Sequence, residues 1–119
     1  MIVAGFGFRS GASEASLADA LSRAANGRVP TALATLTDKA PGLQEFARSR
    51  GLRLLPVTSE AAQTQTTLTR SEASQTHKSL GSVAEATALA AAGPNARLTG
   101  PRHISTDRMA TCAIAIGDD

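Results

Sequence analysis

The first residues of the chain, MIVAGFGFRSGASE (residues 1–14), indicate the class of fold. The apolar run at residues 2–7 contains glycines at its end, which predicts a short buried strand. Apolar residues at helical spacing begin after Ser13, a residue type that often caps helices, and Asn26-Gly27 predicts where this helix ends. A strand followed by a glycine-rich turn and a helix is typical of an α/β protein.

Strand and helix patterns continue to alternate along the chain. We expect strands at residues 32–36, 52–57, 97–99 and 109–116, and helices at residues 43–49 and 83–91. Residues 58–80 are rich in Thr, Ser and Gln, which favours a solvent-facing, partly mobile segment with helical turns near Glu60 and Ser71. Residues 101–103 indicate a surface loop. The sequence therefore predicts one α/β domain over residues 1–119, with about five strands.

Composition excludes several classes of partner. Of the 119 residues, 42% are hydrophobic and only 3% are aromatic, and the formal net charge is +2. This charge is small for a nucleic-acid surface, and base stacking needs aromatic rings, so we expect no nucleic-acid partner. We find no apolar run long enough for a membrane span and no signal-peptide pattern. A soluble, cytoplasmic protein without a membrane partner is therefore expected.

Few residues of the sequence are suited to metal or hydrolase chemistry. The single cysteine, Cys112, lies in an alternating apolar run and is expected to be buried. The two histidines, His77 and His103, show no metal-ligand spacing, so we predict no metal site. No Gly-x-Ser-x-Gly elbow supports a catalytic pairing of His77 with a serine.

The glycines of the first turn do not follow a nucleotide-binding pattern. Gly5, Gly7 and Gly11 are spaced GxGxxxG rather than GxGxxG, and no Walker sequence is present, so no cofactor is predicted. Two interpretations of the turn remain. It can form an anion cradle of backbone N–H groups with Arg9 at its tip, or it can be a tight connection with Arg9 in solvent.

Lys39 follows the second predicted strand. Because parallel strands end at the same edge of a sheet, we expect Lys39 to face Arg9 across one crevice. The alternative is that Asp38 and Lys39 form a solvated surface pair.

Five short segments, in order along nearly the whole chain, are similar to motifs of one family. They are GFGFR (5–9), DKAPGL (38–43), TRSE (69–72), GSVAEATAL (81–89) and ATCAIA (110–115). Together they resemble the CobE/CbiG C-terminal domain family of cobalamin biosynthesis. Two positions differ: Ala40 stands where the family often has an acidic residue, and Arg102 stands where a lysine is frequent.

The resemblance implies a three-layer α/β/α domain with a mostly parallel or mixed sheet. It also implies a stand-alone, CobE-like protein that lacks the hydrolase part of CbiG-type proteins. We expect it to bind a carboxylate-rich corrin or precorrin intermediate as a carrier or accessory factor, and other enzymes of the pathway are further possible partners. One alternative is a small enzyme acting on such an intermediate; another is a docking subunit of a pathway methyltransferase. No catalytic residue is assigned, and an enzyme is less favoured.

The acetate and propionate groups of a corrin intermediate would need fixed cations and N–H donors around them. The resemblance and the distribution of polar residues together predict the ligand-binding residues. They are Gly5, Gly7, Arg9, Ser10, Gly11, Ser13, Lys39, Ser71, Glu72, His77, Ser82, Glu85 and Arg102.

Overall fold

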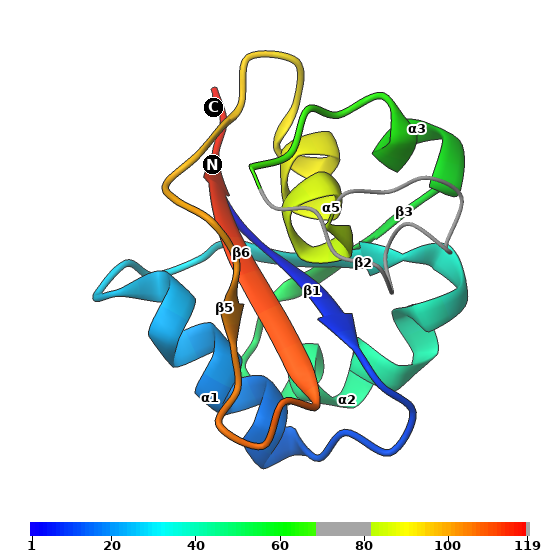
Figure 1. Cartoon of the computed structure of the whole chain (residues 1–119), viewed down its shortest axis with the longest axis vertical. Helices are drawn as coiled ribbons and strands as arrows, with labels where there is room; N and C mark the ends of the chain where they lie inside the picture. Colours follow the sequence, from blue (N-terminus) through cyan, green and yellow to red (C-terminus); the bar gives the residue numbers. More distant parts are fainter. Residues whose placement is uncertain (69–81, 119) are drawn as a thin grey trace.

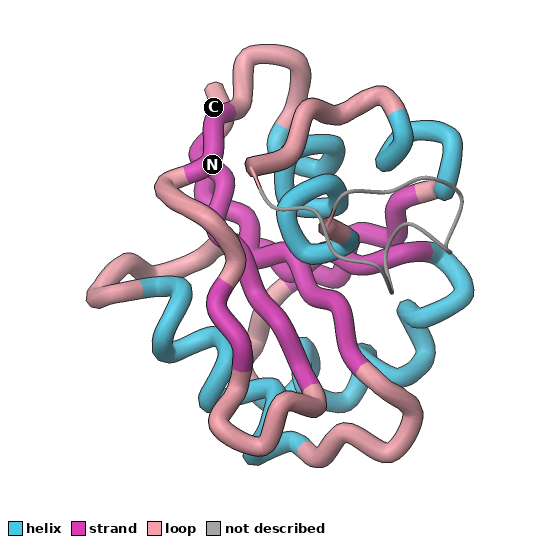
Figure 2. Tube along the Cα trace, viewed as in Figure 1, coloured by secondary structure: helices cyan, strands magenta, loops and turns pink. Residues whose placement is uncertain are grey.

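The computed structural model describes residues 1–68 and 82–118. A central sheet carries helices on both of its faces (Figures 1 and 2). The strands are β1 (Ile2–Phe8), β2 (Ala32–Leu36), β3 (Arg53–Val57), β4 (Arg97–Leu98), β5 (His103–Ile104) and β6 (Ala110–Ile116). The helices are α1 (Glu14–Ala25), α2 (Ala40–Ser49), α3 (Ser59–Gln63) and α5 (Val83–Ala92), with a 3₁₀ turn, η1 (Thr37–Lys39), before α2.

The sheet is mixed, with the strand order β3-β2-β1-β6-β4, and β5 also pairs with β6. β1, β2 and β3 are parallel to one another, as the alternating pattern of the sequence predicted. β6 is antiparallel to β1, and its register places Ala113 opposite Gly5 and Ala110 opposite Phe8. The C-terminal ends of β1, β2 and β3 therefore lie along the same side of the sheet.

Two apolar cores separate three layers. On one face, α1 and α2 cover side chains such as Phe6, Leu33 and Ile114. On the other face, α5 and α3 cover side chains such as Val3 and Leu36. The side chains of β6 alternate between the two cores, because successive residues of a strand point to opposite faces. The predicted α/β/α arrangement with a mixed sheet is confirmed.

Local patterns predicted most elements correctly, and two differ. The loop expected at residues 101–103 instead ends in β5, whose two residues pair with Cys112 and Thr111 of β6. A strand of two residues has no periodicity of its own, so only its partner defines it. The second helix begins at Ala40, before the expected residue 43. Pro41 is compatible with this start, because a first-turn N–H has no partner within the helix.

Within residues 1–68 and 82–118, every helix is too short or too polar to cross a lipid bilayer. Cys112 is fully buried within β6, as its position in an apolar run predicted. Burial raises the pKa of the Cys112 thiol, because the charged thiolate would lose its hydration.

Candidate functional site

A cleft lies at the edge of the sheet where β1 and β2 end. β1 continues into a turn at residues 9–12, and β2 continues into η1. Because the two strands are parallel neighbours, these connections enclose a common cleft of about 280 Å³. The residues that line it are Phe8, Arg9, Ser10, Gly11, Ala12, Asp38, Lys39 and Gly42. The structure thus places Arg9 and Lys39 on one cleft.

The turn at residues 9–12 forms one wall of the cleft. Ala12 N–H donates to the Arg9 carbonyl (N···O 3.0 Å), and Gly11 has a φ of +89°. A positive φ at the third position is the geometry of a type II turn, which favours glycine. The N–H groups of Ser10 and Gly11 make no hydrogen bond to any described residue. The turn therefore offers two backbone N–H groups that can donate hydrogen bonds to an anion.

The charged side chains of the cleft are of both signs. Neither Arg9 nor Lys39 forms an ion pair with a carboxylate in the described part of the chain. Lys39 Nζ lies 5.3 Å from the centre of the Phe8 ring, a cation–π distance. Asp38 also lines the cleft, so the formal charge of the lining is +1. Asp38 and Phe8 were not among the predicted ligand-binding residues.

Gly42 allows the Phe8 ring to lie against the first turn of α2. A Cβ at this position would come within 2.9 Å of Phe8 Cε2. Phe8 is half-buried, so its ring forms an apolar surface beneath Lys39. The cleft therefore combines an apolar wall with two cations and two backbone donors.

Ser13 caps α1 at the far end of the turn. Its hydroxyl oxygen accepts the Ser16 N–H (3.1 Å), and the two serine hydroxyls are also 3.1 Å apart. Ser16 Oγ donates its single proton to Asp107 Oδ2, so Ser13 must be the donor between the two hydroxyls. The Ser13 hydroxyl is thus used within the protein, in a contact that links it to Asp107.

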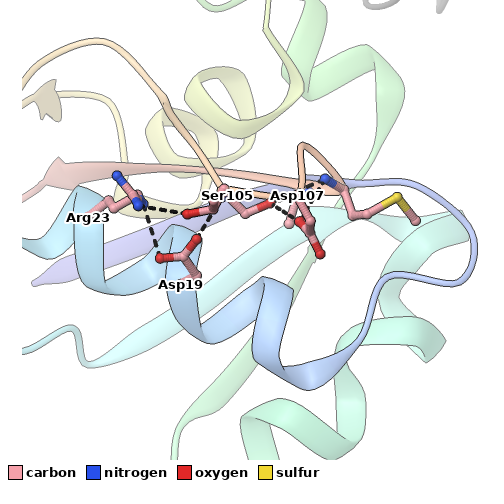
Figure 3. A network of polar contacts seen from close by, with 7 residues as sticks. Asp19, Arg23, Ser105 and Asp107 are labelled. Atoms are coloured by element: carbon pink, nitrogen blue, oxygen red, sulfur yellow. Dashed lines mark hydrogen bonds and ion pairs between the residues drawn. The ribbon is translucent and has the colours of Figure 1, made fainter.

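A polar network joins α1 to the turn between β5 and β6 (Figure 3). At one end, Asp19 accepts the Thr106 N–H (2.7 Å) and the Arg23 Nε–H (3.0 Å). At the other end, Asp107 accepts the Ser105 hydroxyl (2.6 Å) as well as that of Ser16. None of these residues was predicted as part of a site, because a Ser-Thr-Asp run is a general turn signal and does not indicate what the turn contacts.

These hydrogen bonds lower the pKa values of both carboxyl groups. For Asp19, the largest cause is the Thr106 N–H, followed by the Thr106 side chain. For Asp107, the largest cause is the Ser105 hydroxyl, followed by the hydroxyl of Ser16 and the Met109 N–H. Donors that bind a carboxylate favour its ionised form, so both groups are charged at neutral pH.

The structure places Gly5 and Gly7 within β1 rather than in the turn. A Cβ on Gly5 would lie 2.1 Å from the Ala84 carbonyl oxygen, and one on Gly7 would lie 3.4 Å from Val83 Cβ. Gly5 therefore allows α5 to approach the sheet closely, whereas the nearest atom to a Cβ on Gly7 would be Thr111 Oγ1 of β6, at 3.0 Å. Neither Gly5 nor Gly7 lines the cleft that Arg9, Ser10 and Gly11 line.

Ser82, Glu85 and Arg102 form a second group at the start of α5. Ser82 Oγ accepts the Glu85 N–H (3.3 Å) and caps the helix. The fully buried Glu85 carboxylate accepts the N–H groups of Leu68 (2.6 Å) and Arg102 (2.8 Å). Arg102 does not line the cleft of Arg9 and Lys39. The predicted residues Ser71, Glu72 and His77 lie outside the described residues.

Among the described residues, no three His, Cys, Asp or Glu side chains are grouped so that they could hold a metal ion. The arrangement of the cleft instead suits ionic and hydrogen-bonded contact with a small anionic group. An arginine guanidinium can form a forked contact with a carboxylate, and a lysine ammonium adds a second charge.

Comparison with known proteins relates the chain to cobalamin biosynthesis. The family model described as Cobalamin synthesis G C-terminus matches residues 2–115. A structure of CobE, from the cobalamin (vitamin B12) biosynthetic pathway, has a TM-score of 0.87 at 29% identity, covering 97% of this chain and 89% of that chain. The cobalamin biosynthesis protein chiG of Agrobacterium tumefaciens is 37% identical over 100% of both chains, with a TM-score of 0.77.

A putative cobalamin biosynthesis protein G homolog from Sulfolobus solfataricus shares the fold, with a TM-score of 0.73 at 19% identity. The match covers 98% of this chain but only 37% of that longer chain. A search of curated proteins found no match.

Proposed function

Because this chain belongs to the Cobalamin synthesis G C-terminus family, and so to cobalamin biosynthesis, we propose that it binds a carboxylate-rich corrin intermediate as a carrier or accessory factor. The observation that supports this proposal is the cleft at the ends of β1 and β2. It presents Arg9 and Lys39, neither of them in an ion pair with a described carboxylate, beside the N–H groups of Ser10 and Gly11.

The size of the cleft limits what it can hold. Pockets that enclose drug-sized ligands have volumes of about 300–1,000 Å³, and the cleft, at about 280 Å³, lies just below that range. A corrin macrocycle does not fit inside such a space, whereas one acetate or propionate arm does. We therefore propose that the cleft holds a carboxylate at the rim of the ring, with the macrocycle outside it.

A binding experiment with two corrins tests this proposal. Cobyrinic acid carries free acetate and propionate groups, whereas dicyanocobinamide has the same ring with its side chains amidated and carries no phosphate. The purified protein is titrated with each, and the visible spectrum and ligand mass are followed over time. We expect a one-to-one complex with cobyrinic acid, much weaker binding of dicyanocobinamide, and an unchanged ligand mass.

The other outcomes favour different functions. Conversion of the corrin into a product of different mass would favour an enzyme. Absence of binding would favour the docking subunit, and equal binding of both corrins would exclude recognition through carboxylates. Each of these results would contradict the proposal.

Substitutions in the cleft test its location. Arg9→Ala and Lys39→Ala should each weaken cobyrinic acid binding about tenfold, because each removes one charge-assisted contact. Arg28→Ala is the matched control: it removes an exposed arginine from the connection between α1 and β2, at the opposite edge of the sheet. If the Arg9 and Lys39 variants bind as tightly as the Arg28 variant, the ligand lies elsewhere. Titration calorimetry gives all the dissociation constants.

A further inference from the structure

We infer that Asp107 is a positioning residue for Arg9: it fixes both ends of the turn at residues 9–12 and so holds the anion-binding groups in place. This inference rests on the proposed function, because it assigns a role at the same site. Asp107 itself does not line the cleft, so it acts through other residues.

The first connection runs through Met109. The Arg9 N–H donates to the Met109 carbonyl (2.9 Å), which fixes the start of the turn. The Met109 N–H in turn donates to Asp107 Oδ1 (3.1 Å) and to Ser105 Oγ (3.2 Å). Asp107 therefore holds the residue whose carbonyl group binds Arg9.

The second connection runs through α1. Asp107 Oδ2 accepts the hydroxyl proton of Ser16, whose own oxygen contacts Ser13. Ser13 follows the turn directly and caps the helix. The Asp107 carboxylate thus contacts Met109, which precedes β6, and also α1, which begins where the turn ends. Loss of Asp107 would weaken the support of both ends, leaving Ser105 Oγ as the acceptor of the Met109 N–H, whereas loss of either contact alone would weaken one end.

The ionised form of Asp107 suits this role. Its two oxygens accept from Ser105, Ser16 and Met109, and a protonated carboxyl group would lose part of that acceptor capacity. The same hydrogen bonds lower the pKa of Asp107, so the carboxylate stays charged at neutral pH.

Asp19 provides a matched comparison. Its carboxylate also connects α1 to the turn between β5 and β6, through Thr106 and Arg23, but none of its hydrogen bonds leads to Arg9 or Met109. A general loss of contact between α1 and this turn would affect the Asp19 and Asp107 variants alike. A positioning effect on Arg9 would appear only in the Asp107 variants.

The experiment compares Asp107→Ala, Asp107→Asn and Asp19→Ala in the full chain. Hydrogen exchange of the Arg9 amide, followed by NMR, needs no ligand. Asp107→Ala should accelerate that exchange at least tenfold relative to Asp19→Ala. Asp107→Asn keeps one oxygen that can accept from Met109 and should restore most of the protection. Equal exchange in Asp107→Ala and Asp19→Ala would overturn the inference.

The ligand arm uses cobyrinic acid. Asp107→Ala should raise its Kd about tenfold, Asp19→Ala should leave it near the wild-type value, and the Asp107 effect should vanish when Arg9→Ala is also present. An effect that persists without Arg9 would overturn the positioning role. If the wild-type protein does not bind cobyrinic acid, the proposed function fails, and the Arg9 exchange rate alone then decides whether Asp107 positions the turn.

Discussion

Asp38 brings a negative charge to a cleft whose other charged side chains are those of Arg9 and Lys39. A carboxylate ligand would experience repulsion from Asp38 while it pairs with the two cations. Asp38→Asn keeps the shape of the side chain and removes that charge. We expect the variant to bind cobyrinic acid about threefold more tightly, since two unit charges about 4 Å apart interact by about 1 kcal/mol even in bulk water.

Two comparisons make this measurement specific. Asp118→Asn removes an equal charge near the chain terminus, away from the cleft, and should leave the Kd unchanged. The gain from Asp38→Asn should shrink between 50 mM and 500 mM salt, because salt screens exposed charges. Unchanged or weaker binding by Asp38→Asn at low salt would contradict an anion-binding cleft that includes Asp38.

Residue-level prediction from sequence succeeded where a topological rule applies. Lys39 and Arg9 follow strands that are parallel neighbours, so the rule that such strands end at one edge was enough to place them on one cleft. Asp107 and Ser16 are in contact across 91 residues of sequence, and neither position carries a local signal for that contact. Their roles follow from the packing of α1 against the turn between β5 and β6 and from the pairing of β1 with β6, neither of which the residue pattern specifies.

At the scale of elements, the close approach of α5 to β1 depends on Gly5. A Cβ there would lie 2.1 Å from the Ala84 carbonyl oxygen and 2.6 Å from the Ala88 nitrogen, both backbone atoms. Backbone atoms of a buried helix cannot move aside as a flexible side chain can. Gly5→Ala should therefore lower the free energy of unfolding by about 3 kcal/mol, at the upper end for overpacking. Urea denaturation followed by circular dichroism measures this change.

Gly100→Ala is the matched control for Gly5→Ala. A Cβ on Gly100 meets no atom within 4 Å, so its free energy of unfolding should stay within about 0.5 kcal/mol of wild type. If the two variants are equally stable, the tight packing of α5 on β1 is not required for folding.

Gly5 and Gly7 show why the prediction of elements from the sequence was incomplete. A Gly-x-Gly pair before a helix favours a ligand loop, but Gly5 and Gly7 lie within β1, and the backbone of α5, more than 70 residues later in the sequence, packs against Gly5. Short alanine-rich helices and small strand residues are compatible with many partners. Local periodicity therefore predicted the existence of α5 and β1, and tertiary packing determined what their small residues do.

At the scale of the whole molecule, contacts between the two ends of the sequence complete the fold. The start of β1 and the end of β6 lie side by side (Figure 1), and the Met1 ammonium group donates to the Gly117 carbonyl (3.1 Å). Asp19 and Asp107 connect α1 to the turn before β6. Two carboxylates thus join α1, near the start of the sequence, to the turn that leads into β6, near its end.

These two carboxylates give the folded state a defined dependence on pH. Folding lowers both pKa values from their ordinary value of 3.8, so it favours the ionised forms. Their contribution to stability is complete well above pH 3.8 and is lost as the pH falls through the lower pKa values of the folded state. The double variant Asp19→Asn/Asp107→Asn should therefore lose less stability than wild type when the pH falls from 5 to 2.5. The measurement is the decrease in the midpoint of urea denaturation over this pH range. Ser105→Ala removes the largest cause of the lowered Asp107 pKa and should change the pH dependence in the same direction. If the double variant loses as much stability in acid as wild type does, ionisation of Asp19 and Asp107 does not stabilise the folded state.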